Sequence, residues 1–149
     1  MILNATIPVD DVAKSGHKLT LPPRARLTPQ RRALLEAIEA WRGSFTVVEL
    51  YDHARRTEPK LGLATAYRMV DLLRRTGSVR PLSDDKRAAY VRCRPGHHHH
   101  LVCLSCGAVE ETKLCGAPSA AVLKRRHGFD PAEHELDIYG TCASCRSAA

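Results

Sequence analysis

The chain has 149 residues, of which 44% are hydrophobic and 26% charged, so it can bury a core and fits a globular protein of one ordinary domain or two small ones. No apolar run reaches the roughly 18 residues of a membrane-spanning helix. The start, "MILNATIPVDD", lacks the basic and apolar segments of a secretory signal, so we expect a cytoplasmic protein.

Charge and cysteine are both unevenly distributed along the chain. Residues 1–96 carry 18 Lys and Arg against 10 Asp and Glu, whereas residues 97–149 carry 5 against 6. Five of the six cysteines follow residue 100, and a reducing compartment favours metal ligands or free thiols over disulfides. A basic half joined to a Cys/His-rich half indicates one module for a polyanion and one for metal, although a merely solvated basic surface would carry the same charge.

Three helices are predicted in the basic half, after residues 1–18, which form a tail or a short helix without a firm pattern. "RLTPQRRALLEAIEAWRG" has an N-cap threonine followed by proline, with apolar residues at helical spacing. "TVVELYDHARR" begins with a Thr-x-x-Glu capping box, and "LATAYRMVDLLRRTG" is bounded by glycines.

A hairpin is predicted directly after the third helix. Two β-prone segments, 79–82 and 88–92, flank a polar turn. Three helices followed by a hairpin is the order of a winged helix-turn-helix, which we expect over residues 19–92. The helix before the hairpin would then be the recognition helix that enters a DNA groove.

The second half predicts a different kind of unit. A hinge is expected at residues 93–96, and residues 97–149 predict a small α/β domain with strands in "HHHLVC", "AVEE" and "EHELDIYG" and a helix in "PSAAVLKRRHG". The predicted fold class is therefore α+β, with a winged helix followed by a small α/β domain that binds metal.

Two Cys-x-x-Cys pairs lie in this half, Cys103 with Cys106 and Cys142 with Cys145. Two such turns can supply four thiolates to one structural Zn²⁺. The intervening helix and strand would bring the pairs together, although free thiols or redox disulfides also fit the spacing. A site closed by four cysteines has no open coordination position, so it is predicted to stabilise the fold of the domain and not to catalyse a reaction.

Four consecutive histidines precede the first cysteine pair. Because side chains alternate along a strand, the run would present His98 and His100 to one face and His97 and His99 to the other. The first of these two pairs, with Cys93 upstream and Glu111 on the next strand, makes a zinc-binding set, since a thiolate favours zinc over iron or manganese. An expression tag or a loose chelating tract is the alternative, but tags usually lie at chain ends.

Taken together, these segments resemble the ferric uptake regulator family of metal-sensing repressors. The resemblance rests on "RLTPQRRALLEAI", "VVELYDHARR", "LATAYRMVDLLRRTGSV", "HHHHLVCLSCGAVEE", "HGF" and "IYGTCASC", in this order over about residues 24–145. It implies a homodimer that binds double-stranded operator DNA. It also implies an N-terminal winged helix, a C-terminal dimerisation domain, and a bound metal that sets the angle between them.

The family's "TVYR" segment stands here as "TAYR". The resemblance therefore implies that Tyr67 touches a base and Arg68 a phosphate or a base, whereas a partly buried core aromatic is the alternative for Tyr67. The further implied phosphate or minor-groove contacts are Thr65, Arg24, Arg26, Arg31 and Lys60.

Within the family the sequence is most like the zinc uptake branch. Iron- and peroxide-sensing members usually have a histidine at the position of Ser44, and a cysteine at the position of Cys93 is a mark of the zinc branch. The ligand positions of the family's hinge sensor site correspond here to Cys93, His98, His100 and Glu111.

Two departures from the family pattern affect the metal sites. Arg80 stands where zinc members often have Asp or His, so we assign the fourth sensor ligand to Glu111, with Asp84 or Asp85 as alternatives. The family's second regulatory site would use His97, His99, His134 and a carboxylate. The corresponding stretch, "KLCGAPSA", has no acid, so either Cys115 replaces it or the site is weak or absent.

The predicted function is a zinc-responsive transcriptional repressor of zinc-uptake genes, with zinc in structural and regulatory roles and no enzyme activity. Alternatives are a sensor of iron, manganese, nickel or peroxide in the same family, a zinc-storage protein, or a metallohydrolase. Storage leaves the basic winged helix unexplained, and the chain lacks the His-x-Glu of a zinc deaminase. Neither a membrane nor a small-molecule substrate is expected as a partner.

Overall fold

The computed structural model describes Leu19 and residues 21–82 and 88–148. The tail expected at 1–18 and the polar turn of the hairpin, with Asp84 and Asp85, lie outside the described residues. No helix in the described part of the chain is long and apolar enough to cross a membrane.

Three helices form the N-terminal half, α1 (Pro29–Ala40), α2 (Val47–Ala54) and α3 (Leu63–Arg75). The predicted caps are present: the Thr28 hydroxyl accepts a hydrogen bond from the Arg31 N–H at 3.3 Å, and Thr46 and Glu49 complete the capping box. Apolar side chains from all three helices, Leu34, Ile38, Leu50, Met69 and Leu73 among them, form one buried cluster. Burial of these amphipathic faces holds the helices together.

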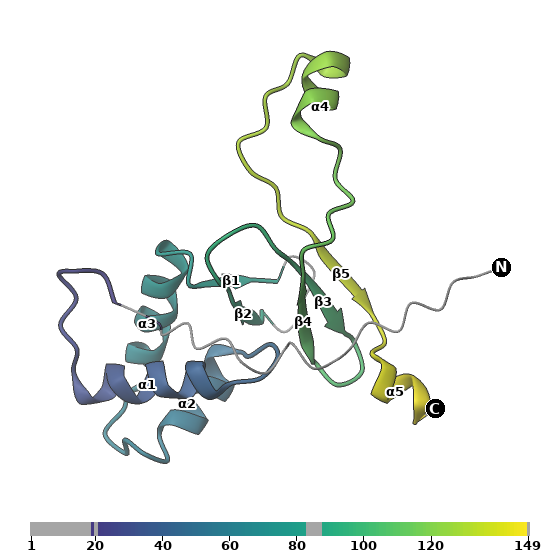
Figure 1. Ribbon diagram of the computed structural model, residues 1–149. Coiled ribbons are helices and arrows are strands. Elements are labelled where there is room, and N and C mark those ends of the chain that lie inside the picture. The colour runs from purple at the N-terminus through teal and green to yellow at the C-terminus, as the bar shows by residue number, and fades with distance from the viewer. Residues whose placement is uncertain (1–18, 20, 83–87, 149) are drawn as a thin grey trace.

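A hairpin of β1 (Val79–Pro81) and β2 (Tyr90–Arg92) follows α3 and pairs antiparallel. Tyr90 also exchanges backbone hydrogen bonds with Phe45, at 2.9 and 2.7 Å, so the hairpin is fastened to the start of α2. Three helices with an attached hairpin confirm the winged helix-turn-helix (Figure 1).

The second half contains a three-stranded sheet in the order β4-β3-β5. Its central strand β3 (His99–Cys103) pairs antiparallel with β4 (Val109–Thr112) and parallel with β5 (Asp137–Gly140). The strand expected over "EHELDIYG" is therefore shorter than predicted, because its partner β3 begins only at His99. A short helix, α5 (Ala143–Ser147), follows β5 and was not predicted.

The segment between β4 and β5 forms an arm that carries α4 (Ala120–His127). Figure 1 shows α4 standing away from the sheet at the end of two long connections. Ser119 caps its start and Gly128, with φ of 64°, ends it, as "PSAAVLKRRHG" predicted. No residue of α4 is buried, so the arm is held to the rest of this chain mainly at its base.

Among the described residues, two sets of contacts between the halves position the hairpin and α1 against the second half. Leu82, Ala89 and Val91 of the hairpin region share a small buried cluster with Cys93 and Val102. On another side, the turn between α1 and α2 lies against the Cys-x-x-Cys turn, where the Ser44 N–H donates to the Gly107 carbonyl at 3.2 Å.

Candidate metal centres and nucleic-acid interface

Three groups of metal-ligating side chains occur among the described residues, and within each group the ligand atoms lie within 4.8 Å of one another. The first is the four-cysteine group of Cys103, Cys106, Cys142 and Cys145. The second, which we call the hinge group, is Cys93, His98 and His100. The third, which we call the arm group, is His97, His99, Cys115 and His134. The alternation expected for the histidine run thus divides it between two groups.

The four-cysteine group joins the end of β3 to the start of α5. Cys106 Sγ lies 3.8 Å from Cys142 Sγ, and the Cys142 N–H donates to Cys103 Sγ at 3.3 Å. Backbone N–H groups of Cys142 and Cys106 lower the pKa of Cys103 to about 6, whereas contacts with the sulfurs of Cys106 and Cys142 raise the pKa of Cys145 to about 12. Four sulfurs this close need a cation before all can ionise, and four thiolates suit Zn²⁺.

The hinge group lies where the hairpin passes into the sheet. Cys93 and His100 are buried, and the His98 and His100 ring centroids lie 5.0 Å apart. Nδ1 of His98 lies 2.9 Å from the Gly96 carbonyl, which fixes the proton there and leaves Nε2 for a metal. His100 Nε2 is buried without a hydrogen-bond partner in the described structure. A thiol and two such imidazoles match the donor set of a zinc site.

Burial controls the protonation of this group. Loss of solvent, with smaller effects from Glu111, Glu135 and Asp137, raises the pKa of Cys93 to about 11 although Arg80 opposes it. Burial, reinforced by the Arg80 charge, lowers the pKa of His100 to about 4. At neutral pH the imidazole is therefore ready to bind a metal, whereas the thiol must release a proton.

Two residues that the sequence did not assign to this site, Arg80 and Asp137, contact the His100 ring. The Arg80 guanidinium donates to the Asp137 carboxylate, and its Nη2 lies 2.6 Å from His100 Nδ1. The Asp137 side chain is fully buried, and its Oδ1 lies 3.4 Å from the same nitrogen. The parallel pairing of His100 with Asp137 creates this contact, and only the strand register could have revealed it.

Glu111 stays a prediction as the fourth hinge ligand. It pairs with His100 across β3 and β4, which places both side chains on one face of the sheet. Its carboxylate, however, lies 3.2 Å from Arg94 Nε and outside the group whose ligand atoms approach within 4.8 Å. Ligation by Glu111 would require its side chain to leave Arg94.

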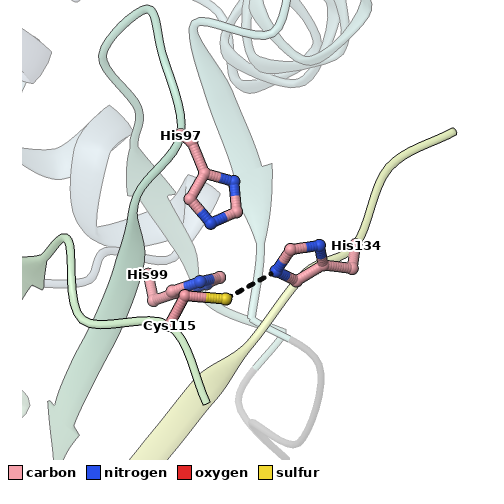
Figure 2. Close-up of side chains that lie close together, drawn as sticks. All are labelled: His97, His99, Cys115 and His134. Atoms are coloured by element: carbon pink, nitrogen blue, oxygen red, sulfur yellow. Dashed lines mark hydrogen bonds between the residues drawn. The ribbon is translucent and has the colours of Figure 1, made fainter. Parts of the chain in front are cut away.

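The arm group draws its members from three segments, as Figure 2 shows. His97 precedes β3 and His99 is its first residue, Cys115 follows β4, and His134 precedes β5. Cys115 Sγ lies 3.2 Å from His134 Nε2, and the His97 ring centroid lies 4.6 and 4.7 Å from those of His99 and His134. The residues that the resemblance implied therefore lie together, with a thiol in place of a carboxylate.

The predicted DNA contacts lie mostly on exposed surface. Tyr67 on α3 is 53% exposed, which disfavours a core role, and Arg68 beside it is exposed. Both line an open groove of about 540 Å³ between α3 and the hairpin. Arg24, Arg26 and Lys60 are exposed, whereas Thr65 and Arg31 are half-buried. Arg31 donates to the Arg26 carbonyl at 2.8 Å, so it also orders the chain ahead of α1.

A winged helix joined to a small sheet with cysteine and histidine metal groups defines the class of metal-responsive transcriptional regulators, which are not enzymes. The chain belongs to the ferric uptake regulator family, whose profile matches residues 24–139. The resemblance inferred from the sequence and the predicted fold class are thereby confirmed.

Individual relatives differ in the metal they are named for. The zinc uptake regulation protein of Mycobacterium tuberculosis is 38% identical over 124 residues, which cover 82% of this chain and 95% of that one. The ferric uptake regulation protein of Rhizobium leguminosarum bv. viciae is 33% identical over 135 residues, covering 87% and 93%. A solved zinc uptake regulator in complex with zinc and DNA has a TM-score of 0.60 at 28% identity, covering 85% of this chain and 87% of that one.

Proposed function

We propose that this chain is a cytoplasmic, zinc-responsive transcriptional repressor that binds operator DNA as a homodimer when its hinge group holds zinc. Likeness to a zinc uptake regulation protein and to a zinc uptake regulator bound to zinc and DNA supports the proposal. The basic winged-helix half, with exposed Tyr67 and Arg68 on α3, supports DNA as the partner.

The observation that carries the proposal is the position of the hinge group. Cys93 directly follows the last strand of the hairpin, whereas His98 immediately precedes β3 of the second half and His100 lies in it. Because its ligands come from both sides of the hinge, metal binding at this group depends on how the two halves are arranged. A metal that binds one arrangement more tightly than another shifts the population toward it.

Regulation then follows from what the chain's own residues do. Cys93 gives up its proton and His98 offers its Nε2 atom, whereas His100 offers Nε2 in the tautomer whose Nδ1–H donates to Asp137 and does not accept from Arg80. Glu111 is the proposed fourth ligand. Bound zinc supplies a fixed cation that links these side chains. The hairpin is then held against β3, so that the two α3 helices of a dimer can be presented at a spacing of about 34 Å, one turn of DNA.

Tyr67 is proposed to contact a base and Arg68 a phosphate or a base. Thr65, Arg24, Arg26, Arg31 and Lys60 are proposed to contact the DNA backbone or the minor groove. Phosphate contacts of this kind supply affinity that falls as salt rises, whereas Tyr67 would supply sequence discrimination. The exposed surface of α4 is the proposed dimer contact.

The second candidate function is a sensor of iron, manganese, nickel or peroxide, because relatives named for iron and peroxide also match. A thiolate at the hinge favours zinc, since iron and manganese prefer oxygen and nitrogen ligands. Competition among these metals in an operator-binding assay discriminates between the two candidates.

The test uses fluorescence anisotropy of labelled duplex from a zinc-uptake promoter, with the full chain in zinc or in chelator. We expect zinc to raise DNA affinity about 5- to 150-fold, the usual range of an allosteric coupling. Cys93→Ser should lose one zinc per chain together with this response. His53→Gln is the control, because it changes an exposed histidine that belongs to none of the three metal-ligating groups and is not a proposed DNA contact. Equal DNA affinity in zinc and in chelator would exclude the proposal.

A further inference from the structure

A largely buried arginine from the winged-helix half reaches into the hinge group. Arg80 lies on β1, and its side chain is only 15% exposed. Its guanidinium donates to the fully buried Asp137 carboxylate on β5, and its Nη2 lies 2.6 Å from His100 Nδ1 on β3. A guanidinium stays protonated and has no acceptor atom, so it cannot ligate a metal. The chain therefore places a fixed cation directly against a ligand of its own metal group.

The contact with Arg80 decides which nitrogen of His100 carries the proton. Because a guanidinium only donates, Nδ1 must accept, and the proton of the neutral ring then stands on Nε2. Nε2 is the nitrogen left for a metal, and it is buried without a hydrogen-bond partner in the described structure. His100 can offer Nε2 only after that proton has passed to solvent, another has reached Nδ1, and Arg80 has withdrawn from the ring.

Asp137 is placed to serve the metal-binding arrangement as well. Its Oδ1 lies 3.4 Å from His100 Nδ1, and the parallel register of β3 and β5 pairs the two residues. A carboxylate that accepts from Nδ1–H orients a ligating imidazole and makes it more basic. Arg80 and the Nδ1–H of the metal-binding tautomer therefore compete for the same carboxylate. This competition has to be overcome at each binding event, so it weakens metal binding at the hinge group.

Stability alone does not account for the ion pair between Arg80 and Asp137. Replacing a buried ion pair by apolar side chains of similar volume is often neutral or stabilising, because both charges lose their hydration when they are buried. The pair acts instead on a neighbouring ligand, since its guanidinium touches both the His100 ring and the carboxylate that the ring needs.

We propose that Arg80 sets the zinc threshold of the hinge group, by holding His100 in the tautomer that does not bind metal until the guanidinium is displaced. The inference rests on the proposed function, in which the hinge group is the sensor. It adds a residue that binds no metal but determines the free zinc concentration at which the sensor loads.

The test measures metal affinity in full-length protein that carries Cys115→Ser and retains zinc in the four-cysteine group. In this background Cys93 is the only thiol outside the four-cysteine group, so a near-ultraviolet thiolate-to-cobalt band reports added Co²⁺ at the hinge. Competition with zinc then gives the zinc affinity. Arg80→Leu should bind both metals about 10- to 100-fold more tightly, the usual range for outer-shell partners. Arg75→Leu is the matched control, because it removes an equal charge from an exposed pair with Asp71.

A second variant removes both buried charges together. In Arg80→Leu/Asp137→Asn the amide oxygen still accepts from Nδ1–H, so this protein should fold and should also bind metal more tightly than the background protein. Equal or weaker metal binding by a folded variant would overturn the proposal. Leucine is chosen because it adds no sulfur that could contribute to the band.

Nitrogen-15 shifts of the His100 ring give a readout that a merely structural role would not move. In metal-free hinge groups the proton should stand on Nε2 in the background protein and on Nδ1 in both variants. His100→Gln protein assigns the signals. A proton on Nδ1 in the background protein itself would refute the proposal without any variant.

DNA binding separates this inference from the proposed function. In anisotropy titrations the zinc concentration for half-maximal DNA binding should fall in Arg80→Leu by the factor by which its zinc affinity rises. Tighter metal binding without any response on DNA would contradict the sensor function alone. A zinc response on DNA with unchanged metal affinity would contradict the role of Arg80 alone.

Discussion

The hinge group and the arm group each take two of the four consecutive histidines, but they differ in how deeply their ligands are buried and in which segments of the chain they join. The hinge group contains buried Cys93 and His100, stands beside the Arg80–Asp137 ion pair, and joins the two halves of the chain. The arm group has one buried member, His99, with exposed partners, and joins segments of one half only. Alternation along a strand thus separates a ligand set suited to coupling from one suited to local stabilisation.

The largest expected effect is loss of the buried carboxylate on the hinge side. Asp137→Ala leaves the Arg80 guanidinium, only 15% exposed, with the exposed Glu135 carboxylate at 3.6 Å in place of its buried partner, and should lower the free energy of unfolding by about 3–5 kcal/mol. The double variant Arg80→Met/Asp137→Leu should recover most of that loss. Asp130→Ala, which breaks an exposed pair with Lys124 on the arm, should change stability by less than about 0.5 kcal/mol in the same urea titrations.

A smaller effect is expected where the halves touch without metal ligands. A Cβ on Gly43 would lie 2.7 Å from the Gly107 carbonyl oxygen, and Gly43 has φ of +84°. Gly43→Ala should therefore cost about 1–2 kcal/mol of stability and weaken zinc-dependent DNA binding without changing metal content. Gly116→Ala on the arm meets no atom within 4 Å and is the control. Equal stability of the two variants would mean that this contact does not position the halves.

In protein whose hinge group holds no metal, the free energy of unfolding should fall at acid pH because of His100. The pKa of His100 falls from 6.5 to about 4 on folding, so below pH 6.5 the unfolded chain binds a proton that the folded chain refuses. Stability is complete above pH 6.5 and is lost progressively as pH falls toward 4, by about 1 kcal/mol in the first unit. Urea titrations at pH 6.5 and 5.5 measure the slope. His100→Gln should reduce it, whereas exposed His127→Gln should leave it unchanged.

The smallest effect tests the orphaned ring of the arm group. In metal-free protein His99→Leu removes two buried nitrogens that lack partners and should raise stability by up to about 1 kcal/mol. With zinc present the order should reverse, because the wild type alone gains binding energy at the arm. Thermal unfolding with and without zinc measures both signs. A variant less stable under both conditions would indicate that His99 is a packed core histidine and not a ligand.

Much of the fold was predictable because its signals are local. Caps at Thr28 and Thr46 and helical spacing located α1 and α2, and the run of short β-prone segments predicted the hairpin. Strand alternation also divided the histidines correctly between two faces. By contrast, α5 and the true start of β5 were missed, since a five-residue helix and a strand end depend on their neighbours.

The sequence by itself determined the ligand types, their pairing in two Cys-x-x-Cys turns, and the basic winged-helix half, because these depend on residue identity and short spacing. Only the tertiary structure decided which distant groups share a site. The parallel register of β3 and β5 brings buried Asp137 and Arg80 to His100, and the course of the arm brings Cys115 to His134. Contacts between residues far apart in the chain arise from packing, so short-range sequence patterns do not predict them.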